Sequence, residues 1–153
     1  MLVVALVIVA CAPPPVTTPR MATPSVIVVP TELPNGRVEI ALRPIYLLGA
    51  PARVEVAIVT TSGTITGPTE ARVMASGINE GGSPAEVLVR RLDARAASAS
   101  AGRRATTSVT WDGEDEFGVR VSADAYVLLL EFESNDGGST RTTRATATLH
   151  MND

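Results

Sequence analysis

Residues 109–126 read VTWDGEDEFGVRVSADAY, and this stretch decides the fold. It opens with alternating polarity, which indicates a strand that ends at Trp111, the single tryptophan of a chain that is only 3% aromatic. Because large side chains are scarce in this chain, we expect Trp111 to fill the core at the end of that strand. Asp112 can accept backbone N–H bonds in a turn, and Gly113 and Gly118 can adopt positive φ. The stretch therefore predicts a strand, a tight reversal and the start of another strand.

Apolar residues recur with period two on both sides of this stretch, which predicts strands with one buried face. The candidate strands are residues 37–43, 52–61, 106–111, 124–133 and 139–151, with weaker candidates at 69–75 and 85–92. The residues expected to face the core include Val38, Ile40, Leu42, Val54, Val56, Ile58, Thr107, Val109, Ala145, Ala147, Leu149 and Met151. Several short strands with turn residues between them, and no convincing helix, predict an antiparallel β-sandwich.

Two segments refine this expectation. Residues 124–133 are apolar at both parities, so that strand should be central or covered. The tetrapeptide Asn135-Asp136-Gly137-Gly138 that follows it is a strong hairpin signal. Residues 93–104 combine alanine with serine and glycine but show no apolar stripe, so we expect a mobile loop there in preference to a short helix.

The stretch 109–126 resembles the V-T-W-D-G-x-D-x-x-G-x-x-V-x-x-G-x-Y signature of the immunoglobulin-like domain of the flagellar hook-cap protein family. The motif positions are held by Trp111, Asp112, Gly113, Asp115, Gly118 and Tyr126. Upstream, Pro34-Asn35-Gly36 and residues 52–63 resemble the opening and a hairpin of the same domain. The resemblance covers about residues 34–150 and implies an immunoglobulin-like β-sandwich of about seven strands. Nothing resembles the remainder of a hook-cap protein, so the implied unit is a module.

The resemblance also implies the bounds of the folded domain. It implies one sandwich domain over residues 34–153. The stretch between Gly63 and Arg104 is longer than the family usually has, which implies a loop insertion at residues 64–104.

The N-terminal run Met1–Ala12 is uninterruptedly apolar. As a helix it falls well short of the roughly 30 Å hydrocarbon core of a membrane, so it is better read as a secretory signal. Its end, Ile8-Val9-Ala10-Cys11, resembles the lipobox of bacterial lipoproteins. That resemblance implies a signal peptide over residues 1–10 and lipidation of Cys11. A first β-strand and an ordinary cleaved signal are the alternatives.

Residues 11–33 are expected to form a proline-rich tether behind the lipidated cysteine. Seven of the eleven prolines lie between Ala12 and Pro34, and proline removes backbone donors and fixes φ. Residues 25–29, between two prolines, are a candidate short edge strand.

Composition excludes several classes of function. A net charge of −3 with interspersed arginine gives no basic stripe for nucleic acid. One histidine and one cysteine leave little material for a histidine-built metal site or a catalytic group. The chain has no nucleophile elbow and no glycine-rich phosphate loop. We therefore expect neither an enzyme nor a cofactor.

Three charged features could either be solvent-exposed surface residues or serve in binding. The acids at 112, 114, 115 and 116 loosely match calcium-loop spacing, but residue 123 is alanine where the twelfth-position acid belongs, so a solvated acidic turn without metal is preferred. The arginine pairs 90–91 and 103–104 could touch acidic polymers or lipid head groups, and a solvated role is simpler. His150 is expected on the surface.

These expectations combine into one hypothesis. The chain is a non-enzymatic lipoprotein, anchored outside the cytoplasm to the bacterial cell membrane or outer membrane through Cys11. Its immunoglobulin-like domain serves as a protein-interaction or structural module of a cell-envelope assembly. The alternative is a carbohydrate or cell-wall binding module, against which the scarcity of aromatic residues counts.

Overall fold

The structure, a computed structural model, describes residues 27–33, 36–45, 52–78, 84–122 and 125–150. Within these ranges the chain forms nine strands and no helix, so the expected all-β class is confirmed. Among these residues no helix is long and apolar enough to span a membrane. The predicted signal peptide, the lipidation site at Cys11 and the tether up to residue 26 lie outside the described residues.

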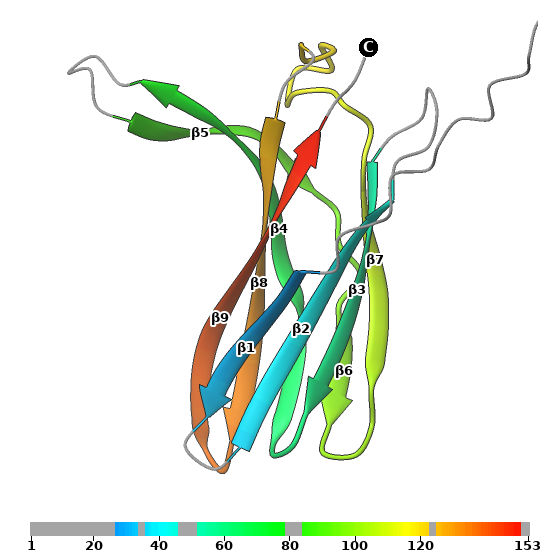
Figure 1. Cartoon of the computed structure of the whole chain (residues 1–153), viewed down its shortest axis with the longest axis vertical. Coiled ribbons are helices and arrows are strands. Elements are labelled where there is room, and N and C mark those ends of the chain that lie inside the picture. Colours follow the sequence, from blue (N-terminus) through cyan, green and yellow to red (C-terminus); the bar gives the residue numbers. More distant parts are fainter. Residues whose placement is uncertain (1–26, 34–35, 46–51, 79–83, 123–124, 151–153) are drawn as a thin grey trace, which may run out of the picture.

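Two antiparallel sheets face each other and form a β-sandwich (Figure 1). The first sheet has the order β1 (Ile27–Leu33), β2 (Gly36–Ile45), β3 (Ala52–Thr60) and β7 (Ala105–Trp111). The second has the order β5 (Pro84–Leu92), β4 (Thr64–Ile78), β8 (Ala125–Asp136) and β9 (Ser139–His150), and β6 (Ala97–Ser100) pairs with the other end of β4. The predicted antiparallel sandwich is confirmed, and its nine described strands exceed the expected seven.

The core lies between the sheets and is built from alternate residues of the strands. Ten of the residues that the alternation assigns to the core are buried: Val38, Ile40, Leu42, Val54, Val56, Ile58, Val109, Ala145, Ala147 and Leu149. Thr107 is half-buried, and Met151 lies outside the described residues. Successive side chains of a strand point to opposite faces, so the aliphatic half of each strand meets that of the other sheet. Other large residues of the core are Trp111, Phe132, Tyr126, Ile65, Val73, Leu128 and Leu130.

Strand β8 is central in its sheet, as the apolar residues on both of its faces predict. It lies between β4 and β9, with Leu128 and Leu130 buried in the core and Val127 and Leu129 half-buried on the other side. The hairpin that joins it to β9 is also confirmed, and Gly137 has the positive φ, 67°, that such a turn requires.

The expected loop insertion at residues 64–104 requires correction, because β4, β5 and β6 occupy most of it. Residues 97–100, part of the expected mobile loop, pair with Thr64–Gly67 of β4. Alanine and serine alternate in β6, so Ala99 is fully buried, and Ser98 Oγ lies 2.7 Å from Thr66 Oγ1. Such small residues carry too little hydrophobicity to signal a strand, but they fit closely beside the long β4.

Strand β1 lies in the segment expected to be tether. The candidate edge strand is present, but it runs over Ile27–Leu33 and pairs with β2 along its whole length. It is the outermost strand of its sheet, a position that tolerates Pro30 because a proline cannot donate to a further ladder. The sheet therefore begins before residue 34.

The β4–β5 hairpin extends past the sandwich. The pairing of β4 with β8 ends at Ala75, and residues 76–78 pair only with β5. Figure 1 shows this end of the hairpin bending away from the other strands. A β-bulge at Val89 adds one residue to β5, since Met74 faces Leu88 whereas Val73 faces Arg90. The hairpin and the bulge position the site described next.

Candidate functional site

The connection from β7 to β8 starts and ends on two aromatic rings in edge-to-face contact. The ring centroids of Trp111 and Tyr126 are 5.1 Å apart, with an interplanar angle of 69°. The indole Nε1–H of Trp111 donates to the carbonyl oxygen of Glu114 at 2.8 Å. The hydroxyl of Tyr126 donates to the carbonyl oxygen of Ser122 at 3.1 Å. Both rings are buried, so they attach the connection to the core while their polar atoms stay satisfied.

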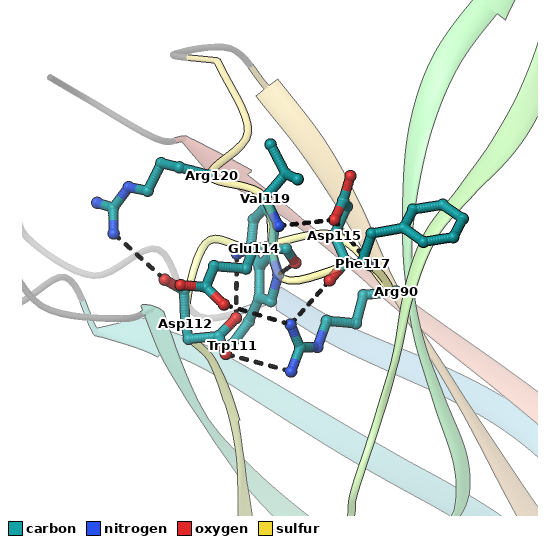
Figure 2. A network of polar contacts seen from close by, with 8 residues as sticks. All are labelled: Arg90, Trp111, Asp112, Glu114, Asp115, Phe117, Val119 and Arg120. Carbon is teal, nitrogen blue, oxygen red and sulfur yellow. Dashed lines mark hydrogen bonds and ion pairs between the residues drawn. The ribbon is translucent and has the colours of Figure 1, made fainter.

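The middle of the connection is organised by the carboxylate of Asp115 (Figure 2). Its Oδ1 accepts the backbone N–H of Phe117 at 2.8 Å and that of Val119 at 2.9 Å. Its own N–H donates to the carbonyl of Val119, and its carbonyl accepts the N–H of Gly118, which has a φ of 76°. A glycine suits that conformation because it has no Cβ to clash. Asp115 thus folds residues 115–119 into a compact turn.

Asp112 organises the first part of the connection in the same way. Its Oδ1 accepts the N–H of Glu114 at 3.0 Å, and Gly113 between them has a φ of 79°. The carbonyl of Gly113 accepts the N–H of Val121 at 2.9 Å, which closes the connection on itself.

Arg90 of β5 joins the hairpin to this turn, as Figure 2 shows. Its Nη1 donates to the carbonyl of Asp115 at 2.8 Å, and its Nη2 lies 3.3 Å from Oδ2 of Asp112. The bulge at Val89 makes this possible, because it sets Arg90 opposite the core residue Val73 and so aims its side chain toward the turn. The side chain is only 29% exposed. The expected solvated role of Arg90 is therefore wrong, and no local sequence signal reports a bulge.

The turn also lies against the outer edge of β5. The backbone N–H of Glu116 donates to the carbonyl of Val89 at 3.0 Å, and Glu116 Oε1 lies 3.6 Å from Nη1 of Arg91. One residue of the turn thus forms a strand-like hydrogen bond with the edge of the sheet.

The carboxylates of the turn have protein partners. Oxygens of Asp112 and Asp115 accept backbone N–H groups, and Asp112 and Glu114 also approach Arg90. Across the described part of the chain, no three side chains of histidine, cysteine, aspartate or glutamate are arranged to hold a metal ion.

Beside this turn the surface is apolar and hollowed. A shallow hollow of about 300 Å³ lies between the β4–β5 hairpin and the turn. Its lining includes Ala75, Leu88, Val89, Phe117, Val121 and Tyr126. Phe117 is 90% exposed at its rim, and Val87, which pairs with Ala75, is 53% exposed. We call the hollow together with Phe117 and Val87 the arm–turn surface.

Sequence reasoning located the turn but not this surface. The six motif residues lie in or at the ends of the β7–β8 connection, where they shape it from within. Phe117 follows directly from the acidic run, yet its exposure depends on the way Asp115 folds the turn. His150 is exposed at the end of β9, where it pairs with Ala125, the first residue of β8.

No protein-family model matches this chain. Comparison with curated proteins finds no match either.

Proposed function

We propose that this chain is a non-enzymatic lipoprotein of the cell envelope whose sandwich domain is a protein-interaction or structural module. The observation that carries the proposal is Phe117, a large apolar side chain left 90% exposed beside an apolar hollow. Exposed apolar clusters with a polar rim mark interaction sites, and aromatic anchors commonly dominate the binding energy.

The strand order supports an immunoglobulin-like assignment of the sandwich. In that fold strands A, B and E share one sheet, and C, F and G share the other, with C′ added beside C in larger forms. Strands β2, β3 and β7 have the order of the first set, and β5, β4, β8 and β9 have the order C′, C, F and G. Tyr126 lies at the start of β8, and its hydroxyl donates to the carbonyl of Ser122, four residues upstream. This arrangement resembles the tyrosine corner of such domains.

The rigidity of the turn supports a role in binding. Asp115 holds the backbone on both sides of Phe117, and Arg90 fixes that turn to β5. A side chain presented from an ordered backbone loses less conformational entropy when a partner binds. Loops held on a rigid sandwich are a common place for such contacts.

The membrane anchor is proposed from Cys11. Lipidation with more than one acyl chain would attach the domain stably to a membrane. Fractionation of cells that express Cys11→Ser tests this, and the variant is expected to leave the membrane fraction. Retention there at the wild-type level would overturn the lipid anchor.

Site-specific photo-crosslinking tests the interaction module. p-Benzoylphenylalanine replaces Phe117 in the full chain in intact cells, and a matched substitution of Thr146, exposed on β9, serves as the control. We expect a discrete protein adduct from position 117 and none from position 146. Adducts that are absent at 117, or identical at both positions, would contradict the proposal.

A second candidate is a carbohydrate or cell-wall binding module. The exposed ring of Phe117, on a turn with four carboxylates, is the observation that favours it, because aromatic faces and carboxylates can contact sugars. Retention of the full chain on purified peptidoglycan, lost in Phe117→Ala, would favour this candidate over the first.

A further inference from the structure

The edges of the two sheets differ in how they are protected from further pairing. β1 carries Pro30, and β9 carries Arg141 and Arg144. β7 is accompanied by the β5–β6 connection, since Thr107 Oγ1 donates to the carbonyl of Arg95 at 2.6 Å. Proline, charge and a covering segment are the usual protections of a sheet edge.

β5 is the least protected edge that the structure describes. Residues 85–89 read AEVLV and contain a single charge, that of Glu86. The segment lies at the outside of its sheet, on the hairpin that extends past the sandwich. It is therefore an open template for another strand.

The chain already places one hydrogen bond on this edge. The N–H of Glu116 donates to the carbonyl of Val89, so that carbonyl points away from β4. The register makes Ala75–Val87 a hydrogen-bonded pair of β4 and β5, so the backbone groups that point away from β4 are the N–H and C=O of Glu86 and Leu88. Among the described residues no other backbone hydrogen bond reaches that side of β5. A strand laid beside residues 84–88 would continue from the position of Glu116.

The side chains next to this edge suit an extended segment. Its alternate side chains would contact Val87 and Phe117, which are 53% and 90% exposed, and the hollow behind them. Backbone bonds to an edge supply affinity in such complexes, and pockets for alternate side chains supply specificity.

Charge argues against a second copy of this chain as the occupant. The carbonyl of Val89 already accepts the N–H of Glu116, so the stretch of β5 that is open to another strand is residues 84–88. Two copies of that stretch paired about a two-fold axis would set Glu86 opposite Glu86, and like charges directly opposite are destabilising.

Charge favours a basic partner instead. Glu86 is exposed and forms no ion pair within the described chain. The turn adds four carboxylates, and the three nearby guanidiniums are those of Arg90, Arg91 and Arg120. Five acids against three bases leave an excess of two negative charges around this edge.

We infer that the β5 edge binds an extended segment of a partner protein as an additional strand, with alternating apolar residues on Val87 and Phe117 and a basic residue beside Glu86. This inference rests on the proposed interaction function, because it names the kind of protein segment that the arm–turn surface takes.

Selection from a phage-displayed library of random peptides, of about seven residues, against the full chain tests the inference. We expect selected peptides to alternate apolar residues and to contain arginine or lysine. Binding of a synthetic selected peptide, followed by fluorescence anisotropy, should be about tenfold or more weaker in Glu86→Pro than in Glu86→Gln. The proline removes an N–H that points away from β4, so the ladder within the sheet is retained. Glu86→Gln is the matched control, because it also removes the charge but keeps the N–H.

A charge swap provides the second readout. Glu86→Arg should weaken the basic peptide and bind better to the same peptide with glutamate in place of its basic residue, an outcome that misfolding cannot produce. An absence of selected peptides, or peptides that bind Glu86→Pro as well as they bind Glu86→Gln, would overturn the inference. If position 117 still crosslinks to a protein in that case, strand addition is wrong and the proposed interaction function stands.

Discussion

Arg90 Nη1 donates a hydrogen bond of 2.8 Å to the carbonyl oxygen of Asp115, which joins the bulged edge strand β5 to the turn that carries Phe117. The contact depends on a single additional residue in β5, because the bulge at Val89 sets Arg90 opposite Val73. Arg90 and Asp115 together determine where the exposed ring lies relative to the sheet edge.

Arg90→Ala should lower the free energy of unfolding by about 1–3 kcal/mol, because it removes a charge-assisted hydrogen bond and an ion pair that are partly buried. The neighbour provides a matched control. Arg91 is 65% exposed and reaches Glu116 only at 3.6 Å, so Arg91→Ala should cost less than about 0.5 kcal/mol. Urea denaturation of both variants measures this, and equal losses would show that Arg90 does not hold the turn.

Asp115→Ala should destabilise the domain by about 1–2 kcal/mol, because the N–H groups of Phe117 and Val119 lose their acceptor. Asp115→Asn keeps an oxygen at the same place and should retain most of the stability. Hydrogen exchange of these two amides reports the local effect. Unchanged protection in Asp115→Ala would contradict the role assigned to the carboxylate.

Gly67→Ala should destabilise the sandwich by about 1–3 kcal/mol through overpacking. A Cβ at position 67 would lie 2.5 Å from Cδ1 of Phe132, which is fully buried and cannot move aside. Gly77→Ala on the same strand is the control. Its Cβ would lie 3.1 Å from a methyl group of the exposed Val87, and its other neighbour, the carbonyl oxygen of Ala85, is at an ordinary contact distance of 3.6 Å. Thermal unfolding should separate the two variants, and a larger loss in Gly77→Ala would contradict the packing argument.

Tyr126→Phe should cost about 1 kcal/mol, since it removes the hydroxyl that donates to Ser122 but keeps the ring against Trp111. Because Trp111 is the single tryptophan, its fluorescence follows unfolding directly. The emission maximum of the folded state should stay as in the wild type. A red shift would mean that the hydroxyl, and not ring packing, keeps Trp111 buried.

Local patterns were sufficient for the strands with one apolar face. Val38, Ile40 and Leu42 alternate with Glu39, Ala41 and Arg43, and such a pattern buries its large apolar side chains together only as a strand on a core. The Asn135–Gly138 signal worked for a similar reason, because glycine is needed where φ is positive. β6 could not be predicted, because Ala97–Ser100 has no hydrophobic pattern of its own. It forms a strand only because it pairs with β4.

The sequence by itself determined that this chain is an antiparallel β-sandwich with a tight turn after Trp111, because period-two polarity and glycine geometry act over a few neighbouring residues. The tertiary structure alone decided which strands pair, where β5 gains its bulge and why Arg90 meets Asp115. It also decided that Phe117 stays exposed beside an open edge. These features depend on contacts between residues far apart in the chain, and the free energy of such contacts is not encoded in any local window.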